Sequence, residues 1–261
     1  MQSRTRFHRL RRTCFATISR VGCLLSWSFA LAFAAWPTTA AADLAFNGQN
    51  RFIMKGSRMT VPITNQGNAP ALAQISLDWG DANRSGSLPF MIDKPLLRLE
   101  PGRTGTVEIY YQGDGLPADR ESYVLLNVLD VPEAPRNNNV LQIALRHRFK
   151  LLYRPKLKQT TDEAIAELTW ELQGQGTPLR ADNPSPYYLT LSDIEIIGTD
   201  GQSCGKPIEH LMLPPFSHHI FDTVTCSADS LRYRLVSDGG NMRPYQTPLA
   251  AGNKRHGVLQ P

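Results

Sequence analysis

Short apolar segments separated by turn residues recur along most of the chain. The clearest in the first half are 59–63, 71–77, 106–111 and 123–128. The stretches between them, at 65–68, 100–102 and 113–115, are rich in glycine, proline and asparagine. Strands at this spacing, joined by such turns, are typical of an antiparallel β-sandwich. No long helical period competes; 161–172 has a weak one, but Thr169 and Trp170 there also suit a strand.

The strand pattern is interrupted once and then starts again. Pro155 cannot continue the strand that ends at Arg154, so the polar stretch up to Gln159 is expected to be a short linker. Strand-like segments resume at 166–172, 187–191, 194–197 and 230–235. We therefore predict an all-β chain with two β-sandwiches in tandem, at 43–156 and 157–249. The end, 250–261, is polar and basic without a pattern, and is predicted to be a disordered tail.

The chain opens with the three parts of a secretory signal peptide. A basic opening with six arginines precedes an apolar run at 21–35, and small residues at 40–42 allow cleavage before Asp43. The alternative is a membrane anchor, which needs roughly 20 apolar residues. This run is shorter and is interrupted by two serines. We predict that 1–42 is removed, and that the mature chain is exported and is not inserted in a membrane.

Removing the leader changes the charge of the protein. The whole chain has 28 basic and 23 acidic residues, and six of the basic ones leave with the leader. The 219 residues that remain carry 22 basic and 23 acidic side chains, a formal charge of −1. No overall basic field is left to attract nucleic acid or an anionic membrane, so neither is expected as a partner.

Two cysteines, Cys204 and Cys226, remain in the mature chain. In an oxidising compartment they are expected to form a disulfide worth about 3 kcal/mol in the chain-entropy model. A metal site is the alternative, because three histidines lie close enough in sequence to supply further ligands: His210, His218 and His219. We favour the disulfide, since the spacings match no zinc pattern.

A long strand is predicted near the middle of the chain, at 139–155. Leu141, Ile143 and Leu145 fall on one face of it by the two-residue period, and its second half is rich in cations. From the pattern alone, the favoured interpretation is an ordinary strand that faces its own core. A long, bulky edge strand left open would promote aggregation, so this strand is either paired in its own sheet or lends its edge to a partner.

A set of motifs follows in fixed order over nearly the whole mature chain. These are Asn50-Arg51-Phe52-Ile53, 89–92, 97–102, 116–122, 126–128, 131–132, 141–155, 183–188 and 213–217. In order and spacing the set resembles the periplasmic chaperones of pilus assembly, the PapD-type family. Two positions depart from the family pattern. Lys94-Pro95 stands where a proline pair is usual, and Asp238-Gly239-Gly240 stands where the family has Asp-Tyr-Gly.

The resemblance implies a periplasmic chaperone with two immunoglobulin-like domains set at an angle, with a cleft between them. It implies no enzymatic activity and no cofactor; the partners would be pilus subunits and an outer-membrane usher. Family subunits lack their last strand, and the chaperone lends its own, here 139–153. Leu141, Ile143 and Leu145 would fill the subunit groove, each burial being worth roughly 1.5–3 kcal/mol. In the free protein, self-association through the same strand is a further expectation that stays open.

The resemblance also implies roles for two groups of charged residues. Arg51 and Lys150 would anchor the terminal carboxylate of the subunit and so set the register of the added strand. Lys150 has the opposite parity to the three apolar residues. Either the strand twists or bulges between them, or the lysine reaches around an edge. Three further residues would form an ionic link between the domains: Glu121, Arg154 and Asp238.

The short connection between Val131-Pro132 and the donor strand carries a further implication of the resemblance. Family members with a short connection there generally serve thicker, rod-like pili, and we extend that class to this chain.

Two other classes of protein are weighed against the chaperone. The chain could itself be a fibre subunit or adhesin of similar fold, but such subunits are expected to begin with an alternating donor segment. An enzyme is disfavoured, because the sequence contains no nucleophile elbow, paired-carboxylate motif or zinc-ligand spacing.

Overall fold

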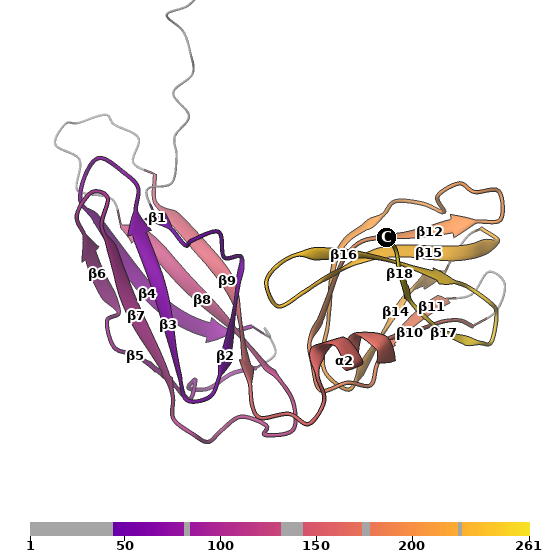
Figure 1. The fold of residues 1–261 in the computed structure, drawn as a ribbon, viewed down its shortest axis with the longest axis horizontal. Helices are drawn as coiled ribbons and strands as arrows, with labels where there is room; N and C mark the ends of the chain where they lie inside the picture. Colours follow the sequence, from indigo (N-terminus) through magenta and orange to yellow (C-terminus); the bar gives the residue numbers. More distant parts are fainter. Residues whose placement is uncertain (1–43, 81–83, 132–142, 174–177, 224–225) are drawn as a thin grey trace, which may run out of the picture. The chain divides into compact units, whose positions relative to one another are not determined.

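The computed structural model describes residues 44–80, 84–131, 143–173, 178–223 and 226–261 (Figure 1). The predicted leader, its cleavage site, Leu141 and the connection at 132–142 lie outside the described residues. In the part of the chain that is described, no helix is long and apolar enough to cross a membrane.

The first sandwich is built from two sheets (Figure 1). One has the order β1 (Leu44–Ala45), β3 (Arg58–Asn65), β7 (Thr104–Tyr111), β5 (Phe90–Ile92). The other has the order β2 (Arg51–Lys55), β9 (Leu145–Arg154), β8 (Ser122–Val131), β4 (Ala71–Trp79), β6 (Leu96–Leu99). Several strands form where the sequence alternates, and these strands bury every second residue. In β4, for example, Ala71, Ala73 and Ile75 are buried while their neighbours are exposed.

The second sandwich also consists of two sheets (Figure 1). One has the order β14 (Ser217–Thr223), β11 (Pro178–Asn183), β10 (Thr169–Leu172), β17 (Lys254–His256). The other has the order β13 (Ile208–Leu213), β12 (Leu189–Gly198), β15 (Ala228–Val236), β16 (Met242–Pro248), β18 (Val258–Leu259). Trp170 lies fully buried in its core, with ring centroids 5.1 Å from Tyr233 and 5.9 Å from Phe221. The predicted class, two β-sandwiches in tandem, is confirmed.

A short helix, α2 (Thr161–Glu167), precedes β10. It begins with a capping box, in which the Thr160 hydroxyl accepts from the Glu163 amide and the Glu163 carboxylate accepts from the Thr160 amide. The weak helical period at 161–172 therefore marks a real helix. The strand expected around Thr169 and Trp170 follows directly after it.

The end of the chain differs from the prediction of a disordered tail. Gly252, with φ of +70°, reverses the chain, and its amide donates to the Leu172 carbonyl. Strand β17 then pairs with β10, and β18 pairs with β16. The side chains of both strands remain exposed, and the strands are held mainly by main-chain hydrogen bonds, with one ion pair from Lys254 of β17 to Asp182 of β11. This pairing leaves no alternating apolar pattern in the sequence, which is why the pattern did not predict it.

Cys204 and Cys226 form a disulfide, as predicted, with their Cα atoms 5.8 Å apart. The bond joins the loop after β12 to the segment before β15. Because the two sulfurs are bonded to each other, they are not free to bind a metal. The described residues contain no group of three or more histidine, cysteine or acidic side chains that could hold one.

Candidate functional site

The most unusual strand of the first sandwich is β9, because its two edges are paired over different lengths. On one side it pairs with β8 from Leu145 to Tyr153. On the other side it pairs with β2 in parallel, and only from Lys150 to Arg154. Within the described residues, 145–149 therefore have a strand partner on one side only. We call this segment the open edge of β9.

The burial of the side chains along β9 changes within the open edge. Phe149, Leu151 and Tyr153 lie in the core of the sandwich. Leu145 continues the same two-residue alternation, yet it is 41% exposed. The predicted strand is shorter in the structure, since β9 begins at Leu145, and Ile143 lies just before it and is 62% exposed. The inner half of the strand thus matches the core-facing interpretation, while its outer half presents bulky apolar side chains to the solvent. Such exposed groups on an unpaired edge favour a partner strand.

The regularity of β9 resolves the question of parity. Its pairing with β8 runs without a shift from Leu145 to Tyr153, so there is no bulge in this part of the strand. Lys150 consequently lies on the opposite face from Leu145, on the face that also carries Leu152 and Arg154. The apolar residues and the lysine are presented by the same strand to two different sides.

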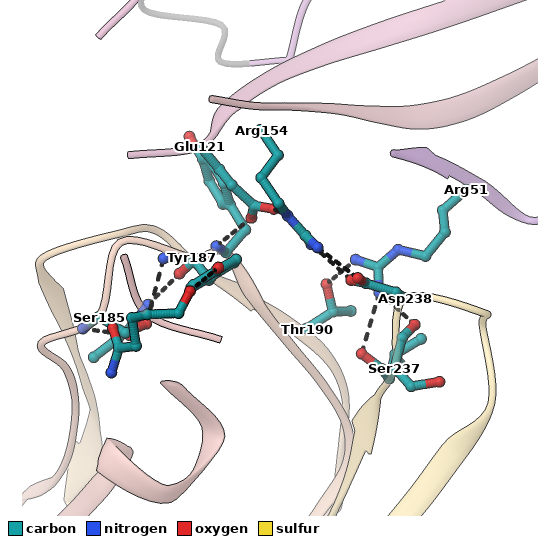
Figure 2. A network of polar contacts seen from close by, with 12 residues as sticks. Arg51, Glu121, Arg154, Ser185, Tyr187, Thr190, Ser237 and Asp238 are labelled. Carbon is teal, nitrogen blue, oxygen red and sulfur yellow. Dashed lines mark hydrogen bonds and ion pairs between the residues drawn. The ribbon is translucent and has the colours of Figure 1, made fainter. Parts of the chain in front are cut away.

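Two cations lie next to the open edge, at the point where β2 begins to pair with β9. Arg51 of β2 and Lys150 of β9 are register partners in the parallel pair. Arg51 is only 8% exposed and donates to the carbonyls of Val236 and Ser237, at 3.1 and 3.0 Å. It also donates to the Thr190 hydroxyl at 3.1 Å (Figure 2). Burial lowers the pKa of this guanidinium, although nearby Asp238 and Glu121 act in the other direction.

Lys150 is half-buried and makes one hydrogen bond that the structure records, between its Nζ and Nε2 of His210, at 2.7 Å. Burial, followed by the charge of Arg51, lowers the pKa of Lys150 to about 8. In the described part of the chain, no carboxylate offsets these two effects on the pKa of Lys150. A negative group entering here would find a lysine that lacks a counter-charge.

His210 was not predicted in this place. The sequence suggested it only as an alternative metal ligand beside the cysteines, whereas the structure brings it from β13 to Lys150. Thr190, which accepts from Arg51, was not predicted either. Neither could be found from the sequence, because each lies far along the chain from its partner and no local pattern marks it.

The three residues predicted for an ionic link are in contact (Figure 2). Arg154 donates to Glu121 at 2.6 Å through Nε, and to both oxygens of Asp238 through its two terminal nitrogens. Glu121 is buried and also accepts from the Tyr188 amide at 2.8 Å. Since Glu121 and Arg154 belong to the first sandwich and Asp238 to the second, the link joins the two.

The pKa values of the link follow from burial and from these bonds. Burial raises the pKa of Glu121 despite the neighbouring Arg154. Burial also acts to raise the pKa of Asp238, but the hydrogen bonds and charge of Arg154 outweigh it and hold the pKa below its ordinary value. Bidentate pairing of this kind is the strong form of an arginine–carboxylate contact.

The altered Asp238-Gly239-Gly240 motif keeps the acidic residue in place. Gly240 has a φ of +83° and donates to the Ser237 carbonyl, which closes a tight turn between β15 and β16. A Cβ at Gly240 would lie 2.6 Å from the side chain of Asn50. The positive φ favours a glycine there, and any larger residue would also have to displace the Asn50 side chain.

Together these features define a binding protein of β-sandwich fold. It offers an open strand edge with exposed apolar side chains, and places a pair of cations at the end of that edge.

The sequence places the chain within a known family. Residues 48–158 match the family described as "Pili and flagellar-assembly chaperone, PapD N-terminal domain". Residues 163–247 match "Pili assembly chaperone PapD, C-terminal domain". The chain belongs to this family of pilus assembly chaperones, as the sequence motifs predicted.

Similar curated proteins and solved structures agree with this family assignment. The chain is 35% identical over 244 residues to the chaperone protein FimB/FhaD of Bordetella pertussis, covering 86% of this chain and 98% of that protein. The crystal structure of the YadV chaperone is similar, with a TM-score of 0.66 and 32% identity over 80% of this chain and all of that one. A Salmonella enterica structure of the SafB chaperone in complex with the SafA pilin has a TM-score of 0.65 and 26% identity. It covers 81% of this chain and 99% of that one.

Proposed function

We propose that this chain acts in the periplasm, where it captures pilus subunits through the open edge of β9, caps them and passes them to an outer-membrane usher. The observation that carries the proposal is the change along one regular strand. Phe149, Leu151 and Tyr153 of β9 lie in the core, whereas Leu145 and the preceding Ile143 are exposed beside an edge that has no strand partner among the described residues. The SafB–SafA complex, a chaperone bound to a pilin, supports this use of the fold.

The position of the cations determines the direction of a guest strand. If its terminal carboxylate reaches Lys150, its preceding residues lie along β9 from Phe149 back to Leu145. The guest strand then runs in the same direction as β9, so the pairing is parallel, like that of β2. Main-chain hydrogen bonds supply affinity that does not depend on the sequence of the subunit.

The cation pair has donors left for a carboxylate. An arginine side chain has five N–H groups. Arg51 uses three of them in the bonds that the structure records, to Val236, Ser237 and Thr190. The remaining donors and the Lys150 ammonium would give the carboxylate charge-assisted hydrogen bonds. This anchor would fix the register, since a slip by one residue turns every guest side chain to the wrong face.

A periplasmic pull-down tests the proposal. Wild-type protein and an Arg51→Ala/Lys150→Ala double variant serve as bait, and mass spectrometry identifies the proteins retained. We expect wild type to hold a small, strand-rich secreted protein that the double variant loses.

Arg98→Ala is the matched control, because it removes an exposed cation of β6 and should leave capture intact. Circular dichroism establishes that each variant is folded. If folded wild type retains no such partner, the proposal is wrong and a structural role in the fibre is favoured instead.

A further inference from the structure

We propose that His210 is a positioning residue of the carboxylate anchor: it holds the Lys150 ammonium in the free chaperone and takes up a proton when a subunit carboxylate binds. This inference rests on the proposed function and adds a pH dependence to it. The geometry behind it is the 2.7 Å contact between Lys150 Nζ and His210 Nε2.

The contact determines the protonation state of the free site. An ammonium group has three donors and no acceptor, so Nε2 of His210 must accept and cannot carry a hydrogen. His210 is therefore neutral, with its hydrogen on Nδ1. The pKa of His210 is lowered by burial first, and then by the charges of Lys150 and Arg51, which agrees with this assignment.

Among the residues that the structure describes, no carboxylate raises the pKa of His210. Lys150 and Arg51 are the charged groups that act on it from β9 and β2. From β12 the neutral Ser192 lies opposite, and Asp193 of that strand is paired with Arg234. Within β13, alternation points Glu209 to the other face. The free site thus contains three basic groups, of which Lys150 and Arg51 are charged and His210 is neutral.

A bound carboxylate reverses this balance. Its negative charge raises the pKa of both Lys150 and His210, because an opposite charge favours the protonated forms. His210 then takes a proton from the solvent and becomes a second donor beside Lys150. The His210 ring binds its proton more tightly in the complex than in the free chaperone. The affinity for the subunit therefore rises as pH falls below the pKa of His210 in the complex. It stops rising once pH is below the pKa of His210 in the free chaperone. The total gain in affinity for the subunit is roughly tenfold for each unit by which the pKa of His210 in the complex exceeds that in the free chaperone.

Calorimetry tests the uptake of the proton. The probe is a peptide with the terminal sequence of the subunit retained in the pull-down, titrated into the purified chaperone near the ordinary histidine pKa of about 6.5. Two buffers of different ionisation enthalpy give the number of protons bound. We expect uptake with wild type, and loss of most of that uptake in His210→Gln, which keeps a polar side chain beside Lys150. His218→Gln is the control, because His218 is exposed on β14 in the other sheet of the same sandwich.

A second measurement does not depend on a variant. The His210 ring is titrated by NMR in wild type, without and with the peptide, and its midpoint should move to higher pH in the complex. An unchanged midpoint, or equal proton uptake in wild type and His210→Gln, would overturn the inference. The same peptide with an amidated end separates the two proposals. If it binds as tightly as the free acid, the carboxylate anchor itself is wrong, whatever His210 does.

Discussion

At the scale of single residues, Lys150, whose proposed role is to bind a carboxylate, lowers the stability of the free protein. Its charge is half-buried beside Arg51, and its pKa falls to about 8 from the ordinary value near 10.4. A lowered lysine pKa means that the unfolded chain binds the proton more tightly than the folded chain. The folded protein is therefore penalised by this lysine at neutral pH, and the penalty is relieved as pH rises from about 8 towards 10.4.

Replacing Lys150 by methionine should stabilise the free chaperone. At neutral pH we expect the free energy of unfolding to rise by about 1 kcal/mol, after allowance for solvent screening of a half-exposed group. Near pH 9.5 the difference from wild type should shrink, because the wild-type lysine then loses its proton on folding. Urea unfolding at both pH values measures this. A variant less stable than wild type, or a difference independent of pH, would contradict the argument.

At the scale of elements, β9 is one strand whose two ends differ in burial. Its alternation continues without a break from Ile143 to Tyr153, so the sequence predicted the strand but not the place where it leaves the core. The open edge of β9 ends where β2 begins to pair with it, and this depends on how the strands pair and not on the sequence of β9 alone. Arg51 and Lys150 were likewise predicted as an anchor only through the family resemblance; from the sequence pattern alone they would be ordinary surface cations.

Two leucines on the same face of β9 should separate stability from capture. Leu151 is fully buried, so Leu151→Ala is expected to cost about 2–5 kcal/mol of unfolding free energy. Leu145 is 41% exposed, and Leu145→Ala should cost only about 1 kcal/mol while weakening capture several-fold. Urea unfolding and the pull-down compare the two. Equal losses of stability would mean that Leu145 belongs to the core.

The strands themselves divide into those that a pattern predicts and those that it cannot. Strands such as β4 and β7 bury alternate residues and were predicted close to their observed positions. Strands β17 and β18 bury almost nothing and are held by main-chain bonds, which any sequence can make. His210 and Thr190 reach the site only through the contact of the two sandwiches, so no local pattern marks them.

At the scale of the whole molecule, Arg154 joins the two sandwiches through a single guanidinium. It binds Glu121 on one side and Asp238 on the other, and its guanidinium carbon lies 4.9 Å from the centre of the Tyr187 ring. Glu121 has almost no contact with solvent, so its charge depends on this partner.

Replacing Arg154 alone should lower the free energy of unfolding more than replacing both Arg154 and Glu121. Arg154→Met leaves a buried carboxylate unpaired, for which a loss of about 3–5 kcal/mol is expected. Adding Glu121→Gln should recover a large part of that loss, because the buried charge is then gone. Chemical unfolding of both variants and of Glu121→Gln alone gives the coupling energy. A double variant as unstable as Arg154→Met would refute this account.

The position at which β2 begins also affects when a subunit can be captured. Because β2 takes over the edge of β9 at Lys150, a guest strand that lies along 145–149 must end there, and a chain that continues would meet β2. Under the proposed capture, the chaperone thus selects polypeptides by where they stop. The last residue of a subunit is the last to be synthesised and exported, so a subunit qualifies for protection only once it is complete, and a fragment still in transit does not occupy the chaperone.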